Sequence, residues 1–352
     1  MFENTNPYYI LFAFSIIFIS GFFADKIKDR LAPSQTDEYK MVQKYLLNDS
    51  PLYGHNKPKL WIHTKYEYNA RHWESFHSRS SMNVNQPYLH LTIKSIINYC
   101  GDEFNICLID DETFSKLIPS WDIDLKKVEE PMKERIRKQG LMSLLYYYGG
   151  MIVPNSFLCM SPLKPLYDET IGKNKVFVCE SINRTLNMSL KKNASGFIPN
   201  IKFMGSPKNN EEIKNLIEYM KMKNKQNHFT NEPEYLGDIQ RYIQIQVDKN
   251  TCVLIDGDLI GIKTKNKRKP ILIEDLFGDN FIDLATNAYG IYIPEDDILS
   301  RIKYQWFSVM TTEEILKNNF ILSKYMKSSV VDSLQKKTIT SNSIATNVEG
   351  SI

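Results

Sequence analysis

Short apolar segments alternate with longer amphipathic segments from about residue 58 to residue 325 of this 352-residue chain. Apolar runs bounded by Pro, Gly or charged residues predict strands, and apolar residues that recur every three or four positions predict helices. The predicted strands are Lys59–Thr64, Phe104–Ile109, Met151–Val153, Val176–Glu180, Ile201–Met204 and Cys252–Ile255. The predicted helices are Tyr88–Tyr99, Glu112–Leu117, Pro131–Tyr148, Glu211–Lys223, Tyr235–Gln246 and a last helix from Thr311 to about Met326. This alternation indicates an α/β domain with a mostly parallel central sheet and helices on its faces.

The first 25 residues differ from the rest of the chain in polarity. The segment from Tyr8 to Ala24 carries no charge and consists mainly of Ile, Leu, Phe, Ala and Ser. A helix of this length spans roughly 25 Å, near the lower limit for the hydrocarbon core of a bilayer. A cleaved signal peptide is the alternative, but it would need a basic region before Tyr8 and small residues where Ile19 and Phe22 stand. We therefore expect a retained transmembrane anchor over residues 1–25.

The charges around this segment predict its orientation. Lys26, Lys28 and Arg30 follow the apolar segment, whereas only Glu3 precedes it. This asymmetry predicts a single-pass membrane protein with its globular part on the cytoplasmic side. Three Asn-x-Ser/Thr triplets argue for the opposite side, because they would be glycosylation acceptors; they begin at Asn183, Asn187 and Asn193. Such triplets arise by chance in an Asn-rich chain, so we expect the cytoplasmic orientation.

The remaining composition divides the chain into three further parts. Residues 26–57 mix charge, Pro and polar residues and predict a stalk. Residues 58–327 carry the α/β pattern. Residues 328–352 are rich in Ser, Thr and Asn and have little to bury, which predicts a disordered tail.

Charge and cysteine content exclude several function classes. The formal net charge of +3 gives no argument for nucleic acid. The one dense basic run, residues 263–269, lacks the interleaved aromatic residues of single-strand binders. It predicts a solvated loop, and contact with anionic lipid headgroups is the alternative. Five cysteines without CxxC or Cys/His spacing predict reduced, buried thiols rather than a disulfide framework or a zinc site.

Several segments together resemble a known family. A helix ending in Tyr146-Tyr147-Tyr148-Gly149-Gly150 leads into an apolar strand and then into Pro154-Asn155-Ser156. Three further segments complete the order: the opening Lys57-Pro58-Lys59-Leu60-Trp61-Ile62-His63-Thr64, the later Leu163-Lys164-Pro165-Leu166 and the closing Trp306-Phe307-Ser308. This order resembles the glycosyltransferase family with a DXD sugar-binding region, which includes initiating α-1,6-mannosyltransferases and capsular-polysaccharide enzymes. The resemblance implies a GT-A-like nucleotide-sugar transferase fold over residues 58 to 325. The chain also looks like the degenerate, membrane-anchored copies at home in large DNA viruses.

The chain departs from the family at its metal-binding motif. In the family the tripeptide reads Asp-x-Asp, and its carboxylates hold a divalent cation that neutralises the leaving diphosphate. Here Pro154 and Ser156 stand at the two aspartate positions, and Lys138 and Leu141 replace an Asp and an Arg on the preceding helix. Proline offers no side-chain oxygen and serine is a weak, neutral ligand for a hard cation. We therefore expect no metal cofactor at this motif.

The resemblance and the ends of the predicted strands give one set of candidate nucleotide-sugar-binding residues. They are His63, Thr64, Asp110, Asp111, Lys138, Pro154, Asn155 and Ser156. A cation such as Lys138 or Arg137 meets the diphosphate directly, or Lys138 lies on a solvated helix face. Asp110 and Asp111 either contact the nucleotide at a strand end, or Asp111 caps the helix that starts at Glu112. The sequence assigns no catalytic residue.

One further acidic motif follows the last predicted strand. Asp256-Gly257-Asp258 has the spacing of an Asp-x-Asp metal motif but reads first as a hairpin turn into Leu259–Ile262. A displaced metal site is the alternative.

Two functions follow from the sequence. One is a membrane-anchored glycosyltransferase-like protein that transfers a hexose from a nucleotide diphosphate sugar to a hydroxyl acceptor. The other is a catalytically inactive protein of the same fold with a structural or assembly role at a membrane. The expected partners are a membrane and a nucleotide sugar, without nucleic acid. The sequence leaves open whether the chain is an active enzyme and which protein it binds.

Overall fold

A computed structural model describes residues 57–65, 86–182, 196–226, 232–266 and 268–330. Its centre is a six-stranded sheet in the order β2-β1-β3-β6-β5-β7. The strands are β1 (Lys59–His63), β2 (Asn105–Ile109), β3 (Gly150–Ile152), β5 (Val176–Ile182), β6 (Phe197–Ser206) and β7 (Cys252–Ile255). Strand β1 pairs in parallel with β2 and β3, and β5 pairs in parallel with β7. Only β6 is antiparallel to its neighbours, so the prediction of a mostly parallel α/β sheet is confirmed.

The helices follow the predicted order closely. They are α3 (Tyr88–Cys100), α4 (Thr113–Leu117), α5 (Met132–Tyr148), α6 (Lys164–Glu169), α8 (Glu211–Gln226), α9 (Glu232–Asp248), α10 (Ile273–Leu276), α11 (Glu295–Ser300), α12 (Gln305–Val309) and α13 (Thr312–Lys317). Short 3₁₀ turns occupy Leu125–Lys127, Ile171–Lys173 and Ile302–Tyr304. Residues 321–330 form a further helix. A two-stranded sheet of β4 (Phe157–Cys159) and β8 (Gly290–Tyr292) completes the domain.

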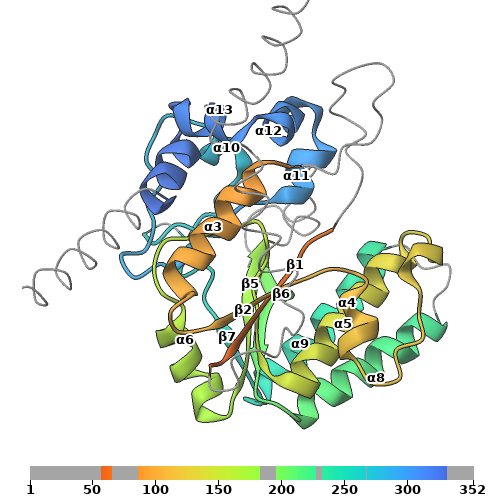
Figure 1. Cartoon of the computed structure of the whole chain (residues 1–352). Helices are drawn as coiled ribbons and strands as arrows, with labels where there is room; N and C mark the ends of the chain where they lie inside the picture. Colours follow the sequence, from red (N-terminus) through yellow and green to blue (C-terminus); the bar gives the residue numbers. More distant parts are fainter. Residues whose placement is uncertain (1–56, 66–85, 183–195, 227–231, 267, 331–352) are drawn as a thin grey trace, which may run out of the picture. The chain divides into compact units, whose positions relative to one another are not determined.

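Helices α5, α8 and α9 cover one face of the sheet (Figure 1). Their apolar side chains share one buried cluster with alternate residues of the strands. The cluster includes Trp61, Ile152, Val178 and Met204 from the sheet and Leu144, Leu216 and Ile239 from the three helices. Gly149 and Gly150 end α5 with φ angles of 67° and 102°, which lets the chain turn at once from α5 into β3.

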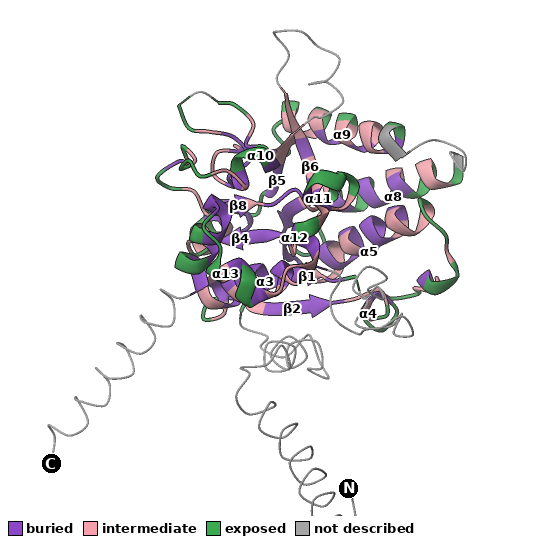
Figure 2. Ribbon diagram, turned by 90° about the horizontal axis from the view of Figure 1, so that it is seen from above, coloured by how far each residue is buried: buried purple, intermediate pink, exposed green. Residues whose placement is uncertain are grey.

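Helix α3 lies on the other side of the sheet (Figure 1). It shares a second buried cluster with the small sheet and the C-terminal helices, including Leu91, Leu158, Ile291, Phe307 and Ile315. Strands β1, β2 and β4 are almost wholly buried between these layers (Figure 2). The five cysteines are free and buried, as the sequence predicts.

Two sequence predictions fail in detail. Residues 257–261 form consecutive turns rather than a hairpin, because the Ile262 amide returns to the Gly257 carbonyl oxygen at 2.8 Å and closes a compact loop. The Thr311 capping box is present, but the helix it starts ends at Lys317 and a separate helix begins at 321.

The predicted anchor, the stalk up to residue 56 and the glycosylation triplets lie outside the described residues, and so does the tail beyond residue 330. Residues 328–330 belong to the last described helix. Among the residues that the structure describes, no helix is both long and apolar enough to cross a membrane.

Candidate functional site

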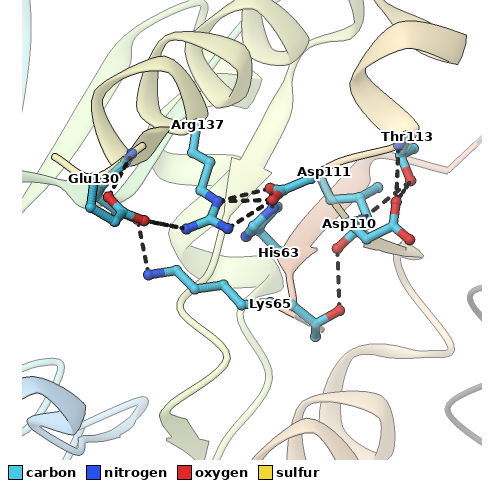
Figure 3. A network of polar contacts seen from close by, with 10 residues as sticks. His63, Lys65, Asp110, Asp111, Thr113, Glu130 and Arg137 are labelled. Carbon is cyan, nitrogen blue, oxygen red and sulfur yellow. Dashed lines mark hydrogen bonds and ion pairs between the residues drawn. The ribbon is translucent and has the colours of Figure 1, made fainter. Parts of the chain in front are cut away.

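Asp111 joins two elements at the carboxyl edge of the sheet. It follows β2, and its carboxylate lies between His63 at the end of β1 and Arg137 in α5 (Figure 3). His63 Nε2 lies 3.0 Å from Asp111 Oδ1. Arg137 donates from Nε to Oδ1 at 2.9 Å and from Nη2 to Oδ2 at 2.7 Å, the two-pronged geometry that suits a guanidinium and a carboxylate. Burial alone would raise the pKa of Asp111, but the hydrogen bonds from His63 and Arg137 hold it well below its ordinary value.

Arg137 also connects this pair to two carboxylates of its own helix region. Its Nη1 lies 3.3 Å from Glu130 Oε1 and 3.4 Å from Glu134 Oε2. Glu134 in turn pairs with Lys65 at 2.9 Å and lies 3.8 Å from Lys138 Nζ. Burial opposes the ionisation of Glu134, but the neighbouring charges of these basic side chains lower its pKa to about 2. The Arg137 side chain is only 6% exposed, whereas the carboxylates around it range from 25% exposed at Asp111 to 54% at Glu130, so the buried guanidinium faces partners at the surface.

The structure places the two carboxylates of the Asp pair in different surroundings, which the sequence did not predict. Asp110, not Asp111, makes the local turn, since its Oδ1 accepts from the Thr113 amide at 2.9 Å and from the Thr113 hydroxyl at 2.7 Å. The side chain of Asp111 is therefore available to pair with His63 and Arg137. The cap predicted for Asp111 is wrong, because the chain direction after β2 turns this carboxylate toward α5.

The solvated-face interpretation of Lys138 is also wrong. Its side chain is 9% exposed, and it lies beside Glu134 one helical turn earlier. Residues four apart share a helix face, and this face of α5 points toward the ends of β1 and β2 rather than into solvent. Thr64 lies nearby and is held by its amide, which donates to the Ile109 carbonyl oxygen at 2.8 Å.

Gly140 holds α5 close to the network. A Cβ atom there would lie 3.0 Å from ring carbons of Phe114, a fully buried residue of α4. Phe114 stacks in turn on the His63 ring, with centroids 5.6 Å apart and an interplanar angle of 8°. Gly140 therefore lets α5 approach α4 closely, and Phe114 supports the ring of His63.

The Pro154-Asn155-Ser156 segment lies between β3 and β4 on the same edge. Thr92 of α3 donates its hydroxyl to the Asn155 carbonyl oxygen, and the Ser156 carbonyl oxygen accepts from the Ile293 amide at 3.1 Å. The Ser156 side chain is fully buried, and its hydroxyl has no hydrogen-bond partner among the described residues. These contacts fix the segment against α3 and against the chain that follows β8.

Sequence reasoning missed a third group of charges beside this segment. Lys202 of β6 places its Nζ 2.8 Å from Asp296 Oδ2 at the start of α11. Burial would lower the pKa of Lys202, but Tyr292, Asp296 and Glu295 raise it well above its ordinary value. Burial raises the pKa of Glu295 despite the opposing charge of Lys202. The sequence did carry one sign of this group: a lysine stands between Ile201 and Phe203 in an otherwise apolar strand.

The strand order explains why these groups meet. From β1 the chain passes through α3 to β2 on one side and then through α5 to β3 on the other side of β1. The carboxyl end of β1 is thus a topological switch point, where open α/β sheets bind their ligands. The predicted residues His63, Thr64, Asp110, Asp111 and Lys138 gather at the ends of β1 and β2, and Pro154, Asn155 and Ser156 follow β3. Among the described residues, no group of three or more His, Cys, Asp and Glu side chains is arranged to hold a metal ion.

A separate polar cluster follows β5 and β7. Lys263 is buried and pairs with Glu180 at 2.6 Å and with Asp256 at 2.7 Å. Glu180 also accepts from the Gly257 amide at 2.8 Å. The start of the basic run is therefore not a solvated loop, because Lys263 neutralises two carboxylates at the ends of neighbouring strands. This pairing accounts for the Asp256-Gly257-Asp258 turn as a structural element.

No protein-family model and no curated protein matches the sequence. Among solved structures, the chain is similar to the apo form of the glycosyltransferase GlyE from Streptococcus pneumoniae, with a TM-score of 0.38 and 13% identity, over 78% of this chain and 64% of GlyE. It is similar to the PaToxG glycosyltransferase with a TM-score of 0.32 and 14% identity, over 63% of this chain and 80% of that one. It is also similar to the galactosyltransferase LgtC in complex with donor and acceptor sugar analogs, with a TM-score of 0.29 and 13% identity, over 57% and 74% of the two chains. Because these TM-scores lie below 0.5, we base the functional proposal on the contacts of this chain.

Proposed function

We propose that the domain is a glycosyltransferase-like protein that binds a nucleotide diphosphate sugar at the carboxyl ends of β1, β2 and β3. The observation that carries the proposal is the convergence of His63, Asp111 and Arg137 at the switch point beside β1. The network places charged side chains where apolar packing would be more favourable in free energy, because removing ions from water is unfavourable. Ionisable groups with shifted pKa values at a ligand-binding edge mark a candidate functional site, and here they also tie α5 to the sheet.

A divalent cation does not fit the residues at the Asp-x-Asp position. Pro154 has no side-chain donor, and the Ser156 hydroxyl is neutral and buried. The nearest carboxylates after β8, Glu295 and Asp296, already lie beside the Lys202 ammonium. Mn²⁺ and Mg²⁺ prefer carboxylate oxygens, so the proposed binding is independent of a metal at this position.

The proposed reaction is the transfer of a hexose to a hydroxyl acceptor. The acceptor oxygen forms a bond to the anomeric carbon, and the bond from that carbon to the diphosphate oxygen breaks. The nucleoside diphosphate leaves with the bonding electrons, and the hydroxyl proton passes to a carboxylate. We assign that role to Glu295, because it lies two residues after Ile293, whose amide contacts Ser156, and because burial raises its pKa.

Calorimetric titration of the chain with a panel of nucleotide diphosphates and nucleotide sugars, in EDTA and in Mn²⁺, tests the binding. We expect one nucleotide sugar to bind in EDTA with micromolar affinity, and Mn²⁺ to leave this affinity unchanged. Release of nucleoside diphosphate from that sugar tests the transfer, and Glu295→Gln should slow the release without weakening binding. Silence across the whole panel, from a sample shown to be folded by circular dichroism, would refute the binding proposal.

A catalytically inactive protein is the second candidate, and one observation favours it. In this structure Arg137, Lys65 and Lys202 each already face a carboxylate of the chain itself. A network that neutralises itself has less need of a ligand. Binding of the nucleotide sugar without any release of nucleoside diphosphate would support this candidate.

We further propose that residues 1–25 anchor the chain in a membrane with the domain on the cytoplasmic side. The uncharged segment from Tyr8 to Ala24 and the basic residues that follow it support this. Resistance of the full chain to carbonate extraction from membranes tests the anchor. Protection of the domain from protease added outside sealed cells tests the orientation.

A further inference from the structure

Lys202 lies two residues beyond the last pair that β6 forms with β3, in a part of β6 that stays beside β5. The last paired residues of β3 and β6 are Ile152 and Met204. Pro154 lies two residues after Ile152, and Lys202 lies two residues before Met204. Because β3 and β6 are antiparallel, both residues come at the same edge of the sheet. On its other side, β6 pairs Met204 and Asn200 with the consecutive residues Val178 and Cys179, so Ile201–Phe203 form a bulge. Bulges re-aim side chains and are frequent beside functional sites.

The segment from Tyr292 to Asp296 lies beside Lys202 and also contacts Ser156. The Ile293 amide donates to the Ser156 carbonyl oxygen, and Phe157 pairs with Tyr292 in the small sheet. Three residues after Ile293, the Asp296 carboxylate lies 2.8 Å from the Lys202 ammonium, and the neighbouring charge of Glu295 also raises the pKa of Lys202. The phenyl ring of Phe203, next to Lys202, packs on Phe157 with centroids 5.1 Å apart. Lys202 is therefore held beside the segment in which the family carries its metal-binding aspartates.

Resting on the proposed function, we infer that the Lys202 ammonium is a built-in cation that takes the place of the divalent metal and binds the diphosphate of the nucleotide sugar. The Lys202 ammonium lies beside Pro154 and Ser156, the two positions that lack the family's carboxylates. It supplies positive charge there and repels a divalent cation. Its side chain is 31% exposed, so an anion can reach it. Before the ligand arrives, Asp296 is its counterion, and this carboxylate is 68% exposed and can move into water when a diphosphate replaces it. Lysine is a suitable partner for phosphate because it acts as a compact point charge with three donors.

The test is calorimetry with nucleoside diphosphates and inorganic pyrophosphate on the full chain, in EDTA, with four single variants. Lys202→Met should weaken nucleoside diphosphate binding about tenfold to a hundredfold, the range for a hydrogen bond to a charged group, and Lys202→Arg should retain most of the affinity. Lys164→Met is the matched control, because Lys164 is 32% exposed and pairs with Asp168 as Lys202 pairs with Asp296, yet lies in α6 away from the site. Asp296→Asn should strengthen binding, because the diphosphate then no longer has to displace the Asp296 carboxylate from the Lys202 ammonium. Asp296 is exposed, so this change should leave the fold intact.

The outcomes separate this inference from the function on which it rests. If the unmodified chain binds a nucleoside diphosphate in EDTA and both Lys202→Met and Asp296→Asn leave the affinity unchanged, the role of Lys202 is overturned and the proposed function stands. If the unmodified chain binds only when Mn²⁺ is added, the built-in cation is likewise overturned, and metal independence with it. If a folded sample binds neither nucleoside diphosphates nor pyrophosphate, both are overturned.

Discussion

Arg137 holds both carboxylate oxygens of Asp111, with Nε 2.9 Å from Oδ1 and Nη2 2.7 Å from Oδ2. This contact ties α5 to the end of β2 and, through His63, to the end of β1. The guanidinium is therefore both a structural tie and the centre of the candidate site. Variants that separate these two roles are informative.

Arg137→Met should destabilise the domain by about 3 kcal/mol, because it leaves the half-buried Asp111 carboxylate without its main counterion. Urea denaturation followed by circular dichroism measures the change. Arg137→Lys keeps the charge but not the two-pronged contact, so it should lose less. Asp111→Asn combined with Arg137→Met should recover part of the loss, and a double variant as unstable as the sum of the two single variants would contradict a direct coupling.

Gly140→Ala should destabilise the domain by about 1 kcal/mol, although alanine is the better helix former. A Cβ atom at this position would press on the Phe114 ring at 3.0 Å. That ring cannot move away freely, because it is fully buried and lies between His63 and Trp121. Thermal denaturation measures the effect, and the smaller side chain in Phe114→Leu should make Gly140→Ala less harmful. If Gly140→Ala raises the melting temperature by itself, the close packing of α5 on α4 is not rigid.

Acid should weaken the domain through Glu134. Its pKa falls from an ordinary 4.5 to about 2 in the folded chain. A lowered folded-state pKa means that the stabilisation is complete above about pH 4.5 and is lost as the pH falls toward 2. Asp111, with its lowered pKa, adds to the same trend. Melting temperatures between pH 5 and pH 2.5 should therefore fall less steeply in Glu134→Gln than in the unmodified chain, and parallel curves would show that Glu134 gains nothing from its basic neighbours.

The elements of the sheet could be predicted from sequence because each strand is a short apolar run with a clear boundary. Strand β7 matches its predicted range residue for residue, and the Gly149-Gly150 turn into β3 follows from glycine's tolerance of positive φ. The roles of Asp110 and Asp111 could not be predicted, since either carboxylate can reach the next turn and only the chain path after β2 decides between them. Lys202 and Glu295 were missed for a similar reason. They are far apart in sequence, and the charge of Glu295 acts on Lys202 because β8 returns beside β4 and brings the start of α11 to β6.

A metal site built at Pro154 and Ser156 should bind Mn²⁺ well only when Lys202 is replaced as well. Pro154→Asp with Ser156→Asp supplies two carboxylates, but Lys202 stands beside them and would neutralise one in place of Mn²⁺. The second carboxylate would replace a fully buried hydroxyl, and a buried charge without a partner is destabilising. Adding Lys202→Met leaves Mn²⁺ as the available counterion. We expect 1 mM Mn²⁺ to raise the melting temperature of this triple variant by about 5 °C or more, and that of the double variant by less. The control is Pro154→Asn with Ser156→Asn and Lys202→Met, which has similar shape without the negative charge and should not respond. An equal response of the double and triple variants would show that Lys202 does not compete with a metal at this position.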